Sequence, residues 1–309
     1  MEHTLPLESH EPVKVLDEPP PAIRAGWLRA VLSLPLWTAA QVLLSIVALG
    51  LIGSDKADDM AYLVRTPSGI IVQLLQFIGT LAVVLLFRRF IDRRSLISLG
   101  FALDSRIAKD LIAGVLCGIA LISSIFVIIY LLGGITITGI AFPGVPLIFM
   151  TVMLVIVAVN EELFIRGYLL TNFMASTNKY VALAISSLIF SVGHFFNPNT
   201  SLIGFLNIIL AGLVLGIYYV HRRNLWFPIG IHFAWNLFQG PFYGSEVSGV
   251  PVPSVVQITS TGSELLTGGS FGFEASVVTS VVLALSVFVI HLLYRSRAVD
   301  SGQTPPSQP

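Results

Sequence analysis

The sequence predicts an all-α protein: a polytopic membrane helical bundle of about eight transmembrane helices, with a polar site inside the bundle. Hydrophobic residues make up 55% of the 309-residue chain and charged residues only 11%, whereas a soluble domain carries about 25% charged residues. The mean hydropathy is +0.86. Apolar runs of about 20 residues, the length needed to cross a bilayer, recur along the chain. These observations exclude a soluble globular domain.

Eight apolar segments make up the predicted bundle. They lie near residues 30–53, 68–87, 112–133, 146–174, 181–196, 202–220, 225–240 and 276–294. The fourth segment is long and must tilt or project from the bilayer, whereas the fifth and seventh are short. Short spans interrupted by glycine or proline often line a cavity inside the protein rather than face lipid.

The predicted transmembrane domain covers residues 27–297 and lies between two polar tails. Residues 1–26 contain several acids and a run of three prolines, a composition typical of a disordered segment, here expected in the cytoplasm. This tail is not a signal peptide, because it lacks a short basic start and its apolar run comes too late. Residues 298–309 are rich in Ser, Pro and Gln and are also predicted to be disordered.

Basic residues gather on alternate connections between the spans. Fourteen of the 17 Lys and Arg residues lie there: Lys14, Arg24, Arg29, Arg88, Arg89, Arg93, Arg94, Arg106, Lys109, Lys179, Arg222, Arg223, Arg295 and Arg297. The other connections hold only Lys56 and Arg65. Because cytoplasmic loops carry the excess of basic residues, both termini are predicted to be cytoplasmic. The loop 241–275, with three glutamates and no basic residue, is then exported.

Net charge and cysteine content exclude several other classes of function. The formal net charge is zero, so no basic field indicates a nucleic-acid partner. Cys117 is the only cysteine, which excludes a disulfide within the chain and a cysteine metal cluster.

The most informative stretch runs from Asn160 to Arg166, where three ionisable residues interrupt the fourth apolar segment. A charge at membrane depth costs roughly 2.5–3.5 kcal/mol on insertion scales, so such residues indicate a functional site by default. Glu162 and Arg166 are spaced i,i+4 with the acid first, the favourable order for a helical ion pair. Glu161 lies about 100° away around the helix. We predict that Glu162 pairs with Arg166, whereas Glu161 is left to act as a general base.

Two more polar motifs lie on other spans. Phe190 and His194 share a face at i,i+4 in the fifth segment, and His232 and Asn236 do so in the seventh. His232 and Asn236 can both donate hydrogen bonds into one cavity, as an oxyanion hole requires. Taken alone, each motif also fits a structural role, since a polar contact between membrane helices is worth about 0.6–2 kcal/mol.

Together the three motifs supply two assemblies that could hydrolyse a bond. In the first, Glu161 and His194 hold and deprotonate a water, while His232 and Asn236 stabilise the oxyanion. In the second, Glu161, His194 and His232 bind a catalytic zinc that keeps one open position. The residues by themselves leave both assemblies open.

In order and spacing, the motifs resemble the CPBP family, which comprises the type II CAAX prenyl endopeptidases and their bacteriocin-processing relatives. The family pattern is E-E-x-x-x-R, then F-x-x-x-H, then H-x-x-x-N. It stands here as Glu161, Glu162 and Arg166, then Phe190 and His194, then His232 and Asn236. The resemblance covers a predicted catalytic core at 145–240, about a third of the chain.

The resemblance implies an eight-helix intramembrane endopeptidase of the glutamate-dependent kind. Glu161 and His194 would then activate water, and His232 and Asn236 would bind the oxyanion. It implies no obligatory metal or other cofactor, so it favours the first assembly and leaves zinc, and a metalloprotease mechanism, as the alternative. The expected location is a bacterial plasma (inner) membrane.

The expected partners are the lipid bilayer and a membrane-associated protein or peptide substrate, with a CAAX-like sequence as one candidate. The alternative is a non-enzymatic membrane protein, either a transporter or a bacteriocin-immunity scaffold, that uses the buried polar residues for a pathway or for assembly. Against a transporter, no inverted repeat pairs the two halves of the chain.

The predicted topology places the candidate residues at different depths. Glu161 falls near the middle of the fourth segment, just on its cytoplasmic side, whereas His194 falls toward the outer end of the fifth. To contact one water, their helices must tilt, or the turn at 197–199 must be sunk below the outer surface. A turn at that depth is permitted where it lines a cavity within the protein.

Overall fold

A computed structural model describes residues 19–53, 59–101, 103 and 105–295 of the chain. Of the two predicted tails, only residues 19–26 fall within this range. Helices account for nearly all of the described regular structure, and the sole sheet among the described residues has two strands. The predicted all-α class is therefore confirmed.

The helices follow one another closely along the chain. They are α1 (Gly26–Ile52), α3 (Met60–Leu63), α4 (Pro67–Leu86), α5 (Ile107–Leu131), α6 (Val145–Glu162), α7 (Thr171–Met174), α8 (Lys179–Gly193), α9 (Leu202–Arg222), α10 (Trp226–Leu237), α11 (Glu264–Thr267) and α12 (Val277–Arg295). Short 3-10 turns cover Ile97–Leu99, Gly269–Phe271 and Phe273–Ala275, and π-helical turns cover Phe87–Asp92, Leu163–Leu170 and Phe238–Phe242.

Within the described ranges, six helices are long and apolar enough to cross a membrane. They are Gly26–Ile52, Pro67–Asp92, Ile107–Leu131, Val145–Met174, Leu202–Arg222 and Val277–Arg295. Each coincides with one of the eight predicted segments. The fifth and seventh segments form α8 and α10, which have only 15 and 12 residues. At about 1.5 Å per residue, both are shorter than the roughly 30 Å hydrocarbon core, so the count of eight spans stays a prediction.

The fourth segment is one continuous helix with a change of winding in its middle. The α-helical turns of α6 end at Glu162, the π-helical turns Leu163–Leu170 follow, and α7 completes the helix. All eight residues of the π-helical stretch are buried. Wider π turns inside α-helices occur frequently at functional sites.

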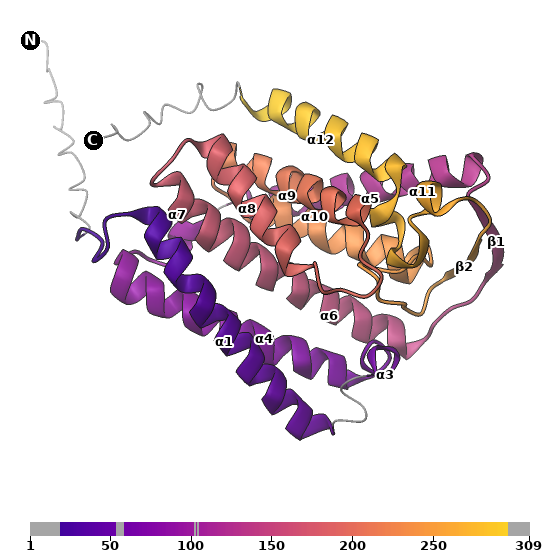
Figure 1. Ribbon diagram of the computed structural model, residues 1–309, viewed down its shortest axis with the longest axis horizontal. Helices are drawn as coiled ribbons and strands as arrows, with labels where there is room; N and C mark the ends of the chain where they lie inside the picture. The colour runs from indigo at the N-terminus through magenta and orange to yellow at the C-terminus, as the bar shows by residue number, and fades with distance from the viewer. Residues whose placement is uncertain (1–18, 54–58, 102, 104, 296–309) are drawn as a thin grey trace, which may run out of the picture.

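Helix α10 lies at the centre of the bundle. It packs against α5, α6 and α9, and ten of its 12 residues are buried. Helices α1 and α4 form a pair on one side and meet the rest of the bundle through α6, while α12 lies against α9 on the opposite side (Figure 1). The short, buried α10 therefore carries its polar side chains into the protein interior rather than to lipid.

Helices α8 and α9 approach each other closely because small residues line their contact. A Cβ atom on Gly212 would lie 2.9 Å from the Cα atom of Ser187, and one on Gly216 would lie 2.3 Å from a methyl carbon of Leu183. Both contacts are shorter than carbon atoms tolerate. The two glycines of α9 thus serve helix packing.

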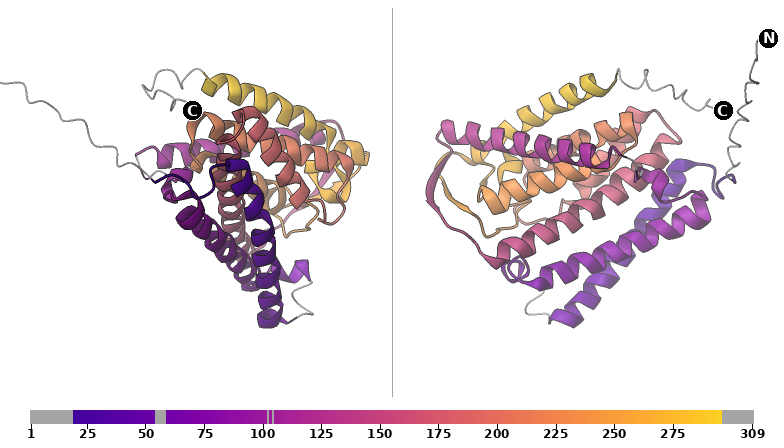
Figure 2. Two further views of the ribbon diagram at one scale, coloured as in Figure 1. Left: turned by 60° about the vertical axis from the view of Figure 1, so that its left-hand side comes forward. Right: turned by 180° about the vertical axis from the view of Figure 1, so that it is seen from behind.

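The connections at one end of the bundle form a small structured cap that the sequence did not predict. Strands β1 (Ile135–Ile140) and β2 (Val256–Ser260) pair antiparallel, with Ile135 opposite Ser260. Helices α3 and α11 lie at the same end, whereas α7 and the C-terminal end of α12 lie at the opposite end (Figures 1 and 2). This cap borders the polar site.

Candidate active site

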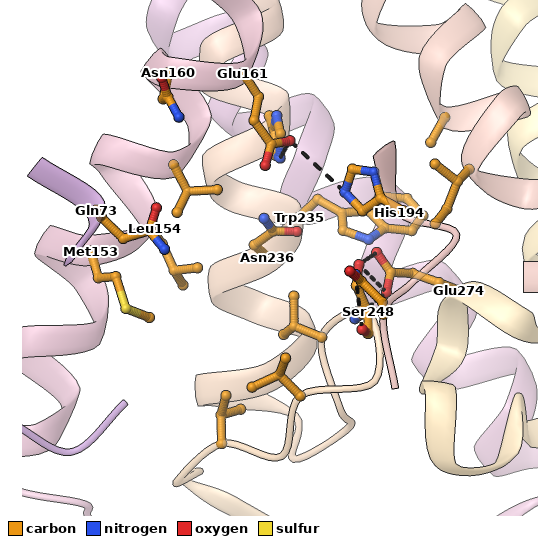
Figure 3. A pocket seen from close by; sticks show the side chains of 18 of the residues that line it. Gln73, Met153, Leu154, Asn160, Glu161, His194, Trp235, Asn236, Ser248 and Glu274 are labelled. Carbon is orange, nitrogen blue, oxygen red and sulfur yellow. Dashed lines mark hydrogen bonds and ion pairs between the residues drawn. The ribbon is translucent and has the colours of Figure 1, made fainter. Parts of the chain in front are cut away.

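Three of the predicted site residues converge from three helices. Glu161, in the last turn of α6, places Oε2 4.0 Å from His194 Nε2 and 3.7 Å from His232 Nε2. Figure 3 shows Glu161 and His194 facing each other across a cavity, with Asn236 beside them. His194 and His232 follow Glu161 in the chain by 33 and 71 positions, and the fold brings both side chains next to it.

The depth of His194 follows from the short length of α8. Asn178 starts this helix, because its side chain accepts a hydrogen bond from the Tyr180 amide, and Gly193 ends it. A helix of 15 residues is about 22 Å long and ends well inside the bilayer if it starts at the surface. Asn197, in the following turn, lines the same cavity as Glu161. The turn after α8 therefore borders the interior cavity beside Glu161, which is the arrangement that a sunken turn requires.

Glu162 is the most enclosed carboxylate of the site. Arg166 Nη1 donates to Glu162 Oε1 at 2.6 Å, so the predicted ion pair is present, and the two side chains are 1% and 0% exposed. His232 Nδ1 lies 2.9 Å from the same oxygen, a contact that the sequence did not predict. Since an ionised carboxylate only accepts hydrogen bonds, Nδ1 carries the proton and Nε2 faces Glu161. Glu162 thus orients a residue of the site as well as pairing with Arg166.

The Phe190 ring packs against the side chains of Arg166, His194 and His232. The Arg166 guanidinium carbon lies 4.2 Å from the centre of the Phe190 ring, a cation–π distance. The same ring contacts the His194 ring edge-on, with centroids 4.7 Å apart. His194 Nδ1 lies 2.9 Å from the Phe190 carbonyl oxygen. This carbonyl can only accept, so His194 also turns Nε2 toward Glu161.

Glu161 Oε2 is buried and has no hydrogen-bond partner among the described residues, and the same is true of Asn160 Oδ1 and Glu162 Oε2 nearby. Of these three atoms, Glu161 Oε2 is the one that lies beside both histidines. Buried polar atoms are normally satisfied, and exceptions call for a physical explanation. Here the atom faces two imidazole Nε2 atoms at distances too long for direct hydrogen bonds but suited to one bridging water, which needs about 2.8 Å to each partner.

The same three side chains carry the donor types of a zinc site. Tetrahedral zinc with its usual bond lengths would hold the donor atoms about 3.4 Å apart, whereas Glu161 Oε2 lies 3.7 Å from His232 Nε2 and 4.0 Å from His194 Nε2. No group of three or more His, Cys, Asp or Glu side chains in the described part of the chain is arranged to hold a metal ion. The donor types suit zinc, but their present spacing does not.

Asn236 lies one helical turn beyond His232 and lines the cavity. Its side chain is buried and makes no hydrogen bond to the described residues, so its amide hydrogens are available to a substrate. His232 differs in this respect. With Nδ1 directed at Glu162, its Nε2 atom donates to an oxyanion only when the ring is doubly protonated.

The cavity has a volume of about 310 Å³ and is lined mainly by apolar side chains of α4, α6, α9 and α10. A second arm of about 320 Å³ shares Glu161, Phe190 and His194 and runs between α1 and α8, where Trp37 and Gly193 line it. Both volumes suit part of a peptide rather than a single ion. The catalytic candidates therefore lie where two arms of one interior space meet.

The sequence did not predict that several further polar side chains line the cavity. They are Gln73, Gln76, Asn160, Asn197, Ser248 and Glu274. Asn160 directly precedes the glutamate pair, and this position in the motif could have indicated that its side chain also lies at the site. The others lie on loops or on a helix whose neighbours could not be known from local sequence.

Glu274 and Ser248 form a clamp at the edge of the cavity (Figure 3). The Ser248 amide and hydroxyl donate to the Glu274 carboxylate at 2.5 and 3.1 Å. Burial raises the pKa of Glu274, and the hydrogen bonds from Ser248 oppose that rise. Ser248 and Gly249 both have positive φ values, 48° and 83°, as a tight hairpin turn requires. The clamp thus fixes the turn 247–250 beside His194.

Comparison with known families agrees with this geometry. Residues 142–238 match the family described as type II CAAX prenyl endopeptidase Rce1-like. All three motifs fall inside the matched residues. The match confirms the predicted resemblance to the CPBP family and indicates a membrane-embedded protease. A search of curated proteins returned no match.

Proposed function

We propose that the chain is a glutamate-dependent intramembrane endopeptidase that hydrolyses a peptide bond of a membrane-associated protein or peptide. We place it in a bacterial plasma membrane with both termini in the cytoplasm. The observation that carries the proposal is the buried, unpartnered Oε2 atom of Glu161 between two imidazole rings. The tight ion pair behind it, which keeps Glu162 and Arg166 occupied with each other, leaves Glu161 as the free base.

In this mechanism one water molecule donates to Glu161 Oε2 and to His194 Nε2, so that a lone pair on its oxygen is directed at the substrate carbonyl. Glu161 takes a proton as the oxygen attacks the carbonyl carbon. Asn236, and His232 in its doubly protonated form, donate to the oxyanion that forms. The C–N bond then breaks, and Glu161 returns its proton to the leaving amine.

The side arm supports a substrate that resides in the membrane. It joins the catalytic side chains to the space between α1 and α8, and these two helices are not among the closely packed pairs of the described bundle. An apolar polypeptide segment or a lipid chain attached to the substrate could therefore occupy this arm. A CAAX-like substrate remains one member of this class.

The proposal is tested by reconstituting purified protein in lipid vesicles together with a mixture of membrane peptides and analysing the products by mass spectrometry. Cleavage that requires Glu161 supports the proposal. If no peptide is cleaved and the vesicles instead transport a solute in a Glu161-dependent way, the non-enzymatic alternative is correct.

Asn236→Ala is expected to lower turnover by about 10²–10³-fold, the usual effect of removing one oxyanion donor. Because the donor acts mainly in the transition state, KM should change little. His232→Ala combined with Asn236→Ala should cost less than the sum of the two single changes, since both serve one charge. Steady-state kinetics on the four proteins measures this. Weakened substrate binding with unchanged turnover would instead make this face of α10 a binding surface.

Removal of metal ions is expected to leave cleavage intact. In the proposed mechanism Glu161 and His194 activate water directly, and no step depends on a metal. The purified protein should contain no stoichiometric zinc by elemental analysis, and activity should survive exhaustive chelation. Reversible loss of activity that added zinc restores would establish the metalloprotease alternative with Glu161, His194 and His232 as ligands.

A further inference from the structure

The two ends of the helical bundle differ sharply in charge. At one end, the described basic residues lie at the start of α1, between α4 and the start of α5, and between α7 and α8. Further basic residues of this end lie between α9 and α10 and at the C-terminal end of α12. At the other end, Arg65 is the single Lys or Arg among the described residues. By the positive-inside rule, the basic end faces the cytoplasm.

The arm of the cavity that is lined by Met153, Asn236 and Glu274, here called the main arm, belongs to the opposite, non-basic end. Its lining begins at Met60 of α3 and includes Val247, Ser248, Val250, Val252 and Glu274, all from connections at that end. Along α6 the lining extends from Met150 inward to Glu161. The catalytic carboxylate therefore lies at the inner end of a space whose lining starts at the capped end of the bundle.

Toward the basic end, the site is closed by packed protein. The π-helical stretch Leu163–Leu170 follows the glutamate pair directly, and all its side chains are buried. From Glu161 to the end of α7 at Met174 the helix extends for about 20 Å at 1.5 Å per residue. Neither arm of the cavity is lined by a residue of α6 or α7 beyond Ile165. No route to the basic end is therefore visible along this helix.

We propose that the catalytic cavity is loaded from the non-cytoplasmic face, so that the substrate is an apolar segment of an exported or outer-leaflet polypeptide. The term substrate rests on the proposed peptidase function, whereas the side of the opening rests on the position of the cavity and on the charge difference between the two ends of the bundle. The described lining of the main arm contains two glutamates and no Lys or Arg. An apolar or basic segment suits this wall better than an acidic one.

Cysteine accessibility tests the side of the opening. The native chain has one cysteine, Cys117, so Cys117→Ala provides a cysteine-free background. Met153→Cys probes the cavity wall, Val252→Cys probes its mouth, and Thr177→Cys marks the exposed connection at the basic end. Each variant is treated with a charged, membrane-impermeant maleimide in right-side-out and in inside-out membrane vesicles.

The proposal expects Met153→Cys and Val252→Cys to label in right-side-out vesicles and Thr177→Cys to label in inside-out vesicles. It is overturned if the two cavity positions label only in inside-out vesicles, or only after detergent dissolves the membrane. Labelling needs no catalysis, so the result does not depend on the peptidase proposal. If the chain is a peptidase, maleimide attached at Met153→Cys should also block cleavage, whereas attachment at Thr177→Cys should not.

Discussion

Replacing Glu161 with glutamine is expected to abolish cleavage and to leave the fold unchanged. Glutamine has the same shape but cannot take a proton from water, and general-base transfer contributes about 10²–10⁴-fold to a rate. Oε2 of Glu161 makes no hydrogen bond to the described residues, so the substitution breaks no hydrogen bond within the described protein. The measurement is turnover of reconstituted Glu161→Gln together with its thermal unfolding in detergent.

Glu264→Gln is the matched control for this change. Glu264 is an exposed glutamate on α11, outside the residues that line the cavity, and its substitution should change neither turnover nor stability. If Glu161→Gln retains activity per folded molecule, the general base is another group and the proposed mechanism is wrong.

Replacing Arg166 with alanine is expected to destabilise the protein by roughly 3–5 kcal/mol, the usual cost of leaving a buried partner charge unpaired. Glu162 would keep only the contact with His232, and the Phe190 ring would lose the guanidinium packed over it. The loss should appear as lower yield and a lower midpoint of unfolding in detergent. Arg65→Ala, at an exposed arginine, is the matched control and should have little effect.

A double variant separates the loss of a charge partner from the loss of packing. Arg166→Met with Glu162→Gln removes both charges while keeping similar volumes, and buried pairs replaced in this way often retain stability. We expect the double variant to be more stable than Arg166→Ala. Equal destabilisation by Glu161→Gln and Arg166→Ala would contradict the division of roles between the two glutamates.

The sequence predicted the features that depend on local spacing. Apolar runs located the helices, and the i,i+4 rule identified the pair formed by Glu162 and Arg166. The convergence of Glu161, His194 and His232 was predicted from chemistry, because buried ionisable side chains need polar surroundings. In the structure the two imidazole Nε2 atoms lie within 4.0 Å of Glu161 Oε2.

The features that escaped prediction depend on contacts between distant segments. Strands β1 and β2 are short and more than 100 residues apart, so neither carries a pairing signal in its own sequence. The contact from His232 to Glu162 depends on how α10 crosses α6, which periodicity does not determine. Glu274 looked like an ordinary loop acid because its partner, Ser248, lies 26 positions away.

The central claim, that Glu161 makes this chain a peptidase, is tested most directly on membranes that contain either the native protein or Glu161→Gln at matched levels. Mass spectrometry of peptide termini compares the two samples. The account predicts a set of new termini, within or beside apolar segments, that occurs only with the native protein. Identical termini in both membranes, with both proteins folded, would contradict it.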